Sequence, residues 1–405
     1  MNARPRIRTT LMATTLVLGI SAGPALASSP APAAGRTAAH RTTGTLDTAA
    51  LRAAIANAGK PGADATAALV RIGGTEGSWL GSAGVHDLAS GTPADPNARF
   101  RAGSVTKVFT AAMVLQLAGE GRVGLNRPAR TYLPDLIPAA YGDVTVRQLL
   151  DHTSGIPSVG SPDDSPEYLY AHRFESRDPA DVVREATAQK PDFAPGAMQH
   201  YDNIGYTVAG LLIERVTGDS YAHQLALRIL RPLHLTNTYV PGADPAIHGP
   251  HNHGYQVFPK PDGSTELRDV TVWGAGDTFA AGDLISTTAD LEHFTRALFT
   301  GQVVRGPQLK EMFTLPAASV RDMKTGKPAA YSAGLSTMRL GGHDVWGKTG
   351  GRWGYNTVIA ATTSPTGALS RTLVYSVNST DAKGSDMNPT AMRVMTTAFG
   401  APDPA

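Results

Sequence analysis

The chain has 405 residues, of which 41% are hydrophobic and 17% charged, and its formal net charge is +2. This composition is that of a folded globular protein, and the length accommodates one large domain or two lobes. A charge so close to neutral argues against a basic surface for nucleic acid, so we expect no nucleic-acid partner. The absence of cysteine excludes disulfides, thiolate metal ligands and cysteine catalysis.

Residues 1–27 have the pattern of a secretory signal peptide. Three early arginines precede a short apolar run at 11–20, and Ala25-Leu26-Ala27 fits an A-x-A cleavage site. A single membrane anchor is the less favoured alternative, because the run is far shorter than the roughly 20 residues that a span needs. We expect cleavage after Ala27 and a secreted, monomeric protein without a stable membrane span. Residues 28–44, rich in small residues and proline, are expected to form a flexible linker.

Hydrophobic periodicity and turn residues predict the elements that follow. Helices are expected at 46–58, 104–121, 144–150, 204–216, 288–299 and 389–399. Strands are expected at 65–72, 78–85, 331–340, 343–348, 355–362 and 369–377. Residues 122–320 are otherwise expected to be mostly helix and loop, with many proline and glycine breaks.

The predicted strands lie at both ends of the chain and most helices lie between them. The economical fold is an α/β plus all-α arrangement: an antiparallel sheet from both chain ends, flanked by terminal helices, with an inserted helical lobe. Within a single domain at 45–405, the α/β lobe would take about 45–110 and 327–400, and the helical lobe about 111–326. A cleft between the lobes is the expected place for a site.

Ser104-x-x-Lys107 is the first of three candidate site motifs. Residues three apart share a helix face, so Lys107 can meet the Ser104 hydroxyl. At a helix start, free backbone N–H groups favour negative charge, and a neutral lysine could take the serine proton. The alternative is that Ser104 only caps the helix and Lys107 is solvated, which is the stronger explanation for so short a motif taken alone.

Tyr201-Asp202-Asn203 is the second motif. In an extended turn, Tyr201 and Asn203 would face one site. A Tyr201 phenolate between two ammonium groups would serve as a base for Ser104 and as a proton donor to the leaving group. Asn203 would hold the substrate amide and the lysine. Alternatively, Asp202 or Asn203 caps the helix that begins near residue 204, and both explanations can hold together.

Lys348-Thr349-Gly350 is the third motif and ends a strand-like run, with Gly351 after it. Glycine leaves room for a substrate backbone against the strand edge. The N–H groups of Gly351 and Ser104 would form an oxyanion hole. Lys348 would supply positive charge to a substrate carboxylate and to the tyrosine.

Three other patterns imitate functional motifs but lack the structural context that those motifs need. Lys324-Thr325-Gly326 lies in a polar stretch and is expected to be a loop. Residues 342–349 fit the P-loop pattern, but a P-loop needs a helix after it, and another strand is expected here. The pair His251-x-His253 comes nearest to metal-ligand spacing and is better explained as loop residues.

In order and spacing, the three motifs resemble the serine β-lactamase and penicillin-binding family, specifically its branch of class C β-lactamases and secreted D-alanyl-D-alanine carboxypeptidases. Stretches at 148–155, 195–214, 281–287 and 346–355 are also similar, so the resemblance spans roughly 45–400. It implies a β-lactamase/transpeptidase-like fold, no metal or cofactor, and an acyl-enzyme on Ser104 with Lys107 and Tyr201 as the acid/base pair. The substrate would meet Asn203, Lys348, Thr349, Gly350, Gly351 and Arg352.

The branch resemblance and export favour a D-alanyl-D-alanine carboxypeptidase acting on peptidoglycan-type peptides. Lys348 keeps open a β-lactamase or esterase on the same machinery, and a β-lactam-acylated sensor is the non-enzymatic alternative. Two departures from the family pattern matter. Asp202 is acidic where a small residue is usual, so it either points away or tunes the site. The arginine that would hold a substrate carboxylate is replaced by Met338, with Arg339 beside it, which leaves Arg352 as an alternative.

Overall fold

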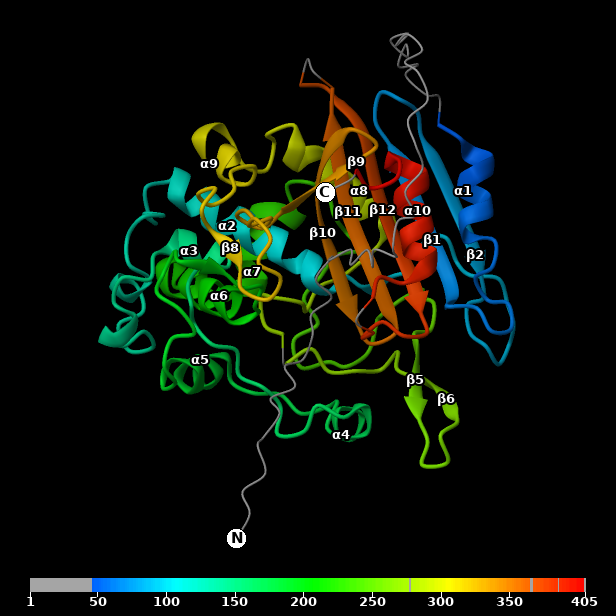
Figure 1. The fold of residues 1–405 in the computed structure, drawn as a ribbon, viewed down its shortest axis with the longest axis horizontal. Helices are drawn as coiled ribbons and strands as arrows, with labels where there is room; N and C mark the ends of the chain where they lie inside the picture. Colours follow the sequence, from blue (N-terminus) through cyan, green and yellow to red (C-terminus); the bar gives the residue numbers. More distant parts are fainter. Residues whose placement is uncertain (1–45, 277, 365–366, 385, 404–405) are drawn as a thin grey trace, which may run out of the picture.

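The centre of the molecule is a six-stranded antiparallel sheet with the order β2-β1-β12-β11-β10-β9 (Figure 1). This computed structural model describes residues 46–403 apart from 277, 365–366 and 385. The signal peptide at 1–27 and the linker at 28–44 lie outside the described residues. The strands are β1 (Ala65–Gly73), β2 (Trp79–Gly84), β9 (Ser336–Leu340), β10 (His343–Arg352), β11 (Tyr355–Thr363) and β12 (Leu369–Ser379).

The two ends of the chain meet at the centre of this sheet. Strand β1 pairs antiparallel with β12, with Val70 opposite Tyr375. The sheet built from both chain ends is therefore confirmed. Two strands differ in extent from the prediction: β9 is shorter at its start, and β10 continues through the third motif to Arg352. Strand β10 continues this far because every residue from Trp346 to Arg352 has a pairing partner on β11.

Helices α1 (Thr48–Ile55) and α10 (Pro389–Phe399) pack together on one face of the sheet (Figure 1). Each is capped by the side chain that directly precedes it. The side chain of Asp47 accepts from the Ala50 N–H, and that of Asn388 accepts from the Ala391 N–H, satisfying donors that a helix start leaves unpaired. Their apolar faces close over β1 and β12 in a buried layer.

Helix α8 (Thr288–Phe299) covers the opposite face of the sheet, against β1, β11 and β12. It lies within the range expected for the helical lobe, yet it packs on the α/β lobe. Helix α2 (Thr106–Gly119) lies beside it and is buried on nearly every side. The fully buried rings of Phe109 and Phe294 join the two helices, stacked with centroids 3.7 Å apart.

The remaining helices lie mostly in the lobe at the left of Figure 1, around α6, except for α4 at the bottom of the view. They are α3 (Val146–Leu150), α4 (Pro166–Ala171), α5 (Pro179–Thr187), α6 (Ile204–Thr217), α7 (Tyr221–Leu225), which continues as a π-helical turn (Ala226–Leu230), and α9 (Gly306–Glu311). Short two-stranded sheets join β3 (Phe100–Arg101) to β7 (Ile285–Ser286), β4 (Met198–Gln199) to β8 (Arg321–Asp322), and β5 (Tyr255–Pro259) to β6 (Thr265–Asp269). The β5–β6 hairpin was missed in a stretch expected to be helix and loop.

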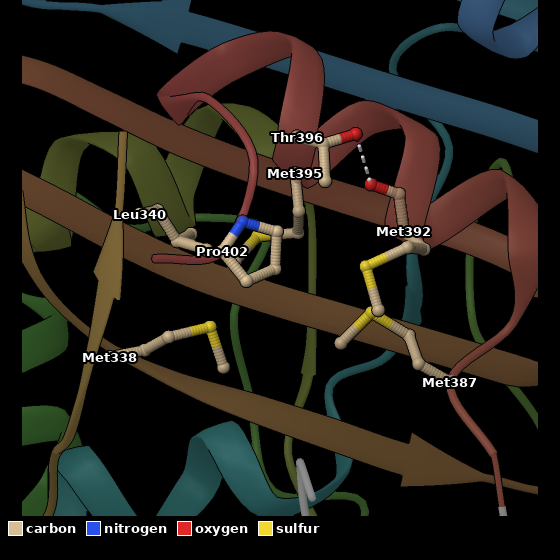
Figure 2. Close-up of a pocket in the computed structure, with 7 residues that line it drawn as sticks. All are labelled: Met338, Leu340, Met387, Met392, Met395, Thr396 and Pro402. Atoms are coloured by element: carbon tan, nitrogen blue, oxygen red, sulfur yellow. Dashed lines mark hydrogen bonds between the residues drawn. The ribbon is translucent and has the colours of Figure 1, made fainter. Parts of the chain in front are cut away.

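A small pocket opens between the sheet edge and α10 (Figure 2). Its walls are mostly methionine side chains, which adapt to irregular gaps: Met338, Leu340, Met387, Met392, Met395, Thr396 and Pro402. None of the candidate site residues lines it, so it belongs to the packing of the α1/α10 layer. Across residues 46–403, with the few gaps noted above, no helix has the length and apolar character to cross a membrane.

The Phe109–Phe294 stack predicts where the fold is most sensitive. Phe109→Ala should lower the free energy of unfolding by about 3–5 kcal/mol, because it leaves a cavity between α2 and α8. Phe174→Ala, at a side chain that is 53% exposed, should change it by less than about 0.5 kcal/mol. Chemical denaturation of both variants measures this difference, and equal losses would show that the stack carries no special weight.

Candidate active site

Ser104 lies in a 3-10 turn (Gly103–Val105) that leads directly into α2. Gly103 has φ +53°, and a side chain there would place its Cβ only 2.7 Å from the backbone nitrogen of Gly351. The turn is therefore pressed against β10, and only glycine fits the contact. The Ala102 carbonyl also accepts a hydrogen bond of 2.8 Å from Thr357 Oγ1 on β11. The sheet thus fixes the position of Ser104.

The Lys107 side chain is completely buried and has three partners. Its Nζ lies 2.6 Å from Asn203 Oδ1, 2.9 Å from the Ala281 carbonyl oxygen and 3.3 Å from Ser104 Oγ. Burial, followed by the nearby Lys348, holds the pKa of Lys107 well below its ordinary value. A neutral amine has two N–H donors and one lone pair, so the two oxygen acceptors leave the lone pair for the serine proton.

In the second motif, the adjacent side chains Asp202 and Asn203 have different contacts. Asp202 Oδ1 accepts a 2.7 Å hydrogen bond from the Gly205 N–H in the first turn of α6. Asn203 makes no capping bond with its side chain and instead accepts from Lys107. The capping and functional explanations therefore both hold, with Asp202 as the cap and Asn203 in the site.

The Tyr201 ring lies between the two lysines. Lys107 Nζ is 5.0 Å from its centroid and Lys348 Nζ is 4.7 Å from it. Burial nevertheless raises the pKa of Tyr201 well above its ordinary value, although the Ser104 hydroxyl opposes the rise. The phenolate expected from two flanking ammonium groups is thus disfavoured. Burial lowers the pKa of both neighbouring lysines, so they offer little charge to hold a phenolate, and Tyr201 starts as an acid.

The third motif lies within β10, and its residues point to opposite faces of the sheet. Lys348 is 4% exposed, its Nζ donates to the Thr349 carbonyl at 2.7 Å, and burial lowers its pKa to about 7. A Cβ on Gly350 would lie 2.1 Å from the Ala102 carbonyl oxygen, so this glycine makes room for the protein's own turn. Thr349 alternates to the other face and lines a small cavity with Asn388 near α10.

The arginines considered for a substrate carboxylate have other roles. Arg352 is 4% exposed, and its guanidinium donates to the Gly274 carbonyl at 2.8 Å and to Thr278 Oγ1 at 3.3 Å. Arg339 is exposed and pairs with Asp344 on the neighbouring strand. Arg352 therefore ties down the segment that follows residue 274, and Arg339 is held at the end of the β9–β10 hairpin by Asp344 and Asp403.

That segment contains a functional group that sequence reasoning missed. Ala280 is fully buried and has φ +57°, an unusual conformation for a residue with a side chain. Its carbonyl accepts from Thr110 Oγ1 at 2.7 Å, and the next carbonyl, of Ala281, accepts from Lys107. The strained turn thus aims two successive carbonyls at α2. The stretch at 281–287 was noted as similar to the family, but a backbone acceptor leaves no side-chain signal.

No metal site accompanies these residues. In the part of the chain that the structure describes, no group of three or more His, Asp or Glu side chains is arranged to hold a metal ion. A buried lysine next to a serine, with a tyrosine ring close to the lysine, is the arrangement of groups that a nucleophilic serine hydrolase uses.

Comparisons with known proteins agree with this chemistry. Residues 48–396 match the Beta-lactamase family. The chain therefore belongs to that family, and it is a serine hydrolase with the fold shared by penicillin-binding proteins and serine β-lactamases.

Among solved structures, a D-stereospecific amidohydrolase from Streptomyces sp. is 31% identical with a TM-score of 0.73, covering 87% of this chain and 98% of that one. The D-amino acid amidase of Ochrobactrum anthropi SV3 is 24% identical with a TM-score of 0.69, covering 86% and 98%, a likeness of fold. Protein flp of Staphylococcus aureus (strain COL) is 30% identical over 217 residues, 53% of this chain. The match spans only 41% of that relative.

Lys348 makes stability depend on pH. With a folded pKa of about 7 and an unfolded value near 10.4, the unfolded chain binds more protons between these limits, so stability should rise with pH across the window. Lys348→Met should reduce this rise, and the part that remains should come from Lys107, whose pKa burial also lowers. Lys324→Met, in the exposed second Lys-Thr-Gly, should leave it unchanged. Melting temperatures from pH 7 to 9.5 measure the slopes, and a wild-type slope in Lys348→Met would contradict the assignment.

Proposed function

We propose that this protein is an exported serine amidohydrolase that cleaves amide bonds at D-amino acid residues through an acyl-enzyme on Ser104. The observation that carries the chemistry is the Lys107 amine. Asn203 and Ala281 occupy two of its directions, and Ser104 Oγ lies in the third at 3.3 Å. These contacts keep the Lys107 amine directed at the Ser104 hydroxyl.

The proposed reaction follows from these positions. Lys107 Nζ takes the Ser104 proton as Oγ bonds to the substrate carbonyl carbon, and the N–H groups of Ser104 and Gly351 stabilise the resulting oxyanion. The C–N bond then breaks as the leaving amine takes the Tyr201 proton. The proton on Lys107 restores Tyr201. Water repeats the sequence on the acyl-enzyme, releasing the acid and freeing Ser104.

Two observations support a D-amino acid amide as the substrate. The Streptomyces relative, matched over 98% of its length, is described as D-stereospecific. Neither Arg339 nor Arg352 is directed to a substrate carboxylate, since each has the structural partners described above. An amide carries no terminal carboxylate and needs no such arginine.

A D-alanyl-D-alanine carboxypeptidase is the second candidate, and the position of Lys348 favours it. A substrate carboxylate beside this buried amine would stabilise its ammonium form and raise its pKa from about 7. In this role Lys348 would replace the missing arginine. The signal-peptide pattern at 1–27 supports export, where peptidoglycan-type peptides are met. One chain carries every proposed site residue, so we propose that a monomer is active.

The nucleophile is tested by intact-mass analysis after benzylpenicillin and, separately, after a fluorophosphonate that modifies activated serines. We expect a single adduct on the wild type and none on Ser104→Ala. Ser154→Ala is the matched control, because Ser154 is buried but holds the Ile156 N–H, and it should keep the adduct. An adduct on Ser104→Ala, or none on wild type with either probe, would refute the assignment.

The substrate is tested by turnover. We expect D-alanine amide to be hydrolysed at least about 100-fold faster than L-alanine amide, since a well-oriented serine discriminates by position. An acyl-D-Ala-D-Ala peptide and a chromogenic cephalosporin are the comparison substrates. Faster release of D-alanine from the peptide would favour the carboxypeptidase, faster cephalosporin turnover a β-lactamase, and a lasting adduct without turnover a sensor.

A further inference from the structure

Asp202 occupies a place behind the catalytic tyrosine that its capping role does not explain. One carboxylate oxygen, Oδ1, caps α6, while the other, Oδ2, lies 3.6 Å from His152 Nδ1. Both side chains are buried, with 7% of Asp202 and 2% of His152 exposed. The contact of Oδ2 with His152 is additional to the capping bond of Oδ1.

His152 connects this carboxylate to Tyr201. Its ring centroid lies 4.5 Å from that of Tyr201. Its backbone is held at φ +62°, which is unusual for a residue with a side chain, and its carbonyl accepts from the His200 N–H at 2.9 Å. Strain of this kind persists only where the surroundings enforce it. The backbone thus places the imidazole between Asp202 and the tyrosine ring.

The protonation state of His152 follows from its contacts. The Asp202 N–H donates to Nδ1 at 3.3 Å, so this nitrogen is an acceptor and the neutral ring carries its proton on Nε2. Burial lowers the pKa of His152, in agreement with a neutral ring. Asp202 Oδ2 therefore faces no cation on His152, and its charge acts on the rest of the site.

Several other titratable groups face the same space. Lys107 comes from α2 and Lys348 from β10. The rings of Tyr206 and Tyr331 lie against His152, tilted and edge-on, with centroids 5.3 and 5.2 Å away. Asp151 and Asp283 are further acids of this region. The Asp202 charge raises the pKa of Lys107, of His152 and of Tyr201. All three responses have the same sign, because an anion favours the protonated form of each group.

We propose that Asp202 is a positioning residue whose buried carboxylate, held at the start of α6 by the Gly205 N–H, sets the pH at which Ser104 becomes reactive. The anion opposes the effect of burial on the lysine amine and delays its neutralisation as pH rises. This inference rests on the proposed role of Ser104 but not on the identity of the substrate. It also explains why an acid can stand where the family usually has a small residue: one oxygen caps the helix and the other tunes the site.

The test is the pH dependence of Ser104 modification by a fluorophosphonate, compared between wild type and Asp202→Asn. Asparagine keeps a carbonyl oxygen for the Gly205 N–H and removes the charge. Without the anion the pKa of each group falls, so the acid limb of the rate profile should move to lower pH by at least about half a unit. Asp202→Ser, which retains a capping oxygen, should give the same shift and serves if asparagine impairs folding.

Asp290→Asn is the matched control. Asp290 is also buried, 8% exposed, and accepts from the Asn237 N–H and Thr238 Oγ1, contacts that include none of the proposed site residues. It should lose stability without moving the profile. An unchanged or upward-shifted acid limb in both Asp202 variants would overturn the inference. No reaction of wild type would overturn it together with the nucleophile assignment, whereas a shifted profile in a protein inactive on D-amino acid amides would refute only the substrate.

Discussion

The site depends on one buried amine. Lys107 has no contact with water, and its position is set by an amide oxygen, a backbone carbonyl and a hydroxyl that come from three separate segments. A buried ammonium is costly unless it is well paired, so burial drives this group toward its neutral form. The same burial that would weaken the fold thereby creates the base, and stability and reactivity are opposed at this position.

Close backbone contacts fix the position of Ser104 as Lys107 is fixed by its three partners. Ser104 cannot shift relative to β10, because Gly103 and Gly350 leave only the space that their neighbours fill. Arg352 fixes the segment whose Ala281 carbonyl reaches Lys107. Three parts of the chain that are distant in sequence are thus joined by contacts that a single added methyl group would break. A nucleophile held so closely needs little reorganisation when it reacts.

Much of this arrangement could be predicted from the sequence. The terminal helices, the central strands and α6 follow from periodicity and capping residues, and Asp202 was recognised as a possible cap. The three motifs predicted which side chains meet through the family whose motifs they resemble, since nothing else in the sequence relates segments so far apart. The β5–β6 hairpin was missed because its strands are short and separated by polar turn residues. The rise in the pKa of Tyr201 could not be predicted from the sequence because desolvation depends on every surrounding group. The contacts of Ala281 and His152 depend on backbone conformation, which residue type does not predict.

The pairing of β1 with β12 also determines when, during synthesis, the active site can form. Ser104 and Lys107 are made early in synthesis, but Gly351 and the strand beneath them come from near the other end of the chain. A nascent polypeptide therefore carries its nucleophile without the sheet that positions it. Contacts between such distant segments also form slowly. The topology therefore delays hydrolase activity until the last strands of the sheet are in place.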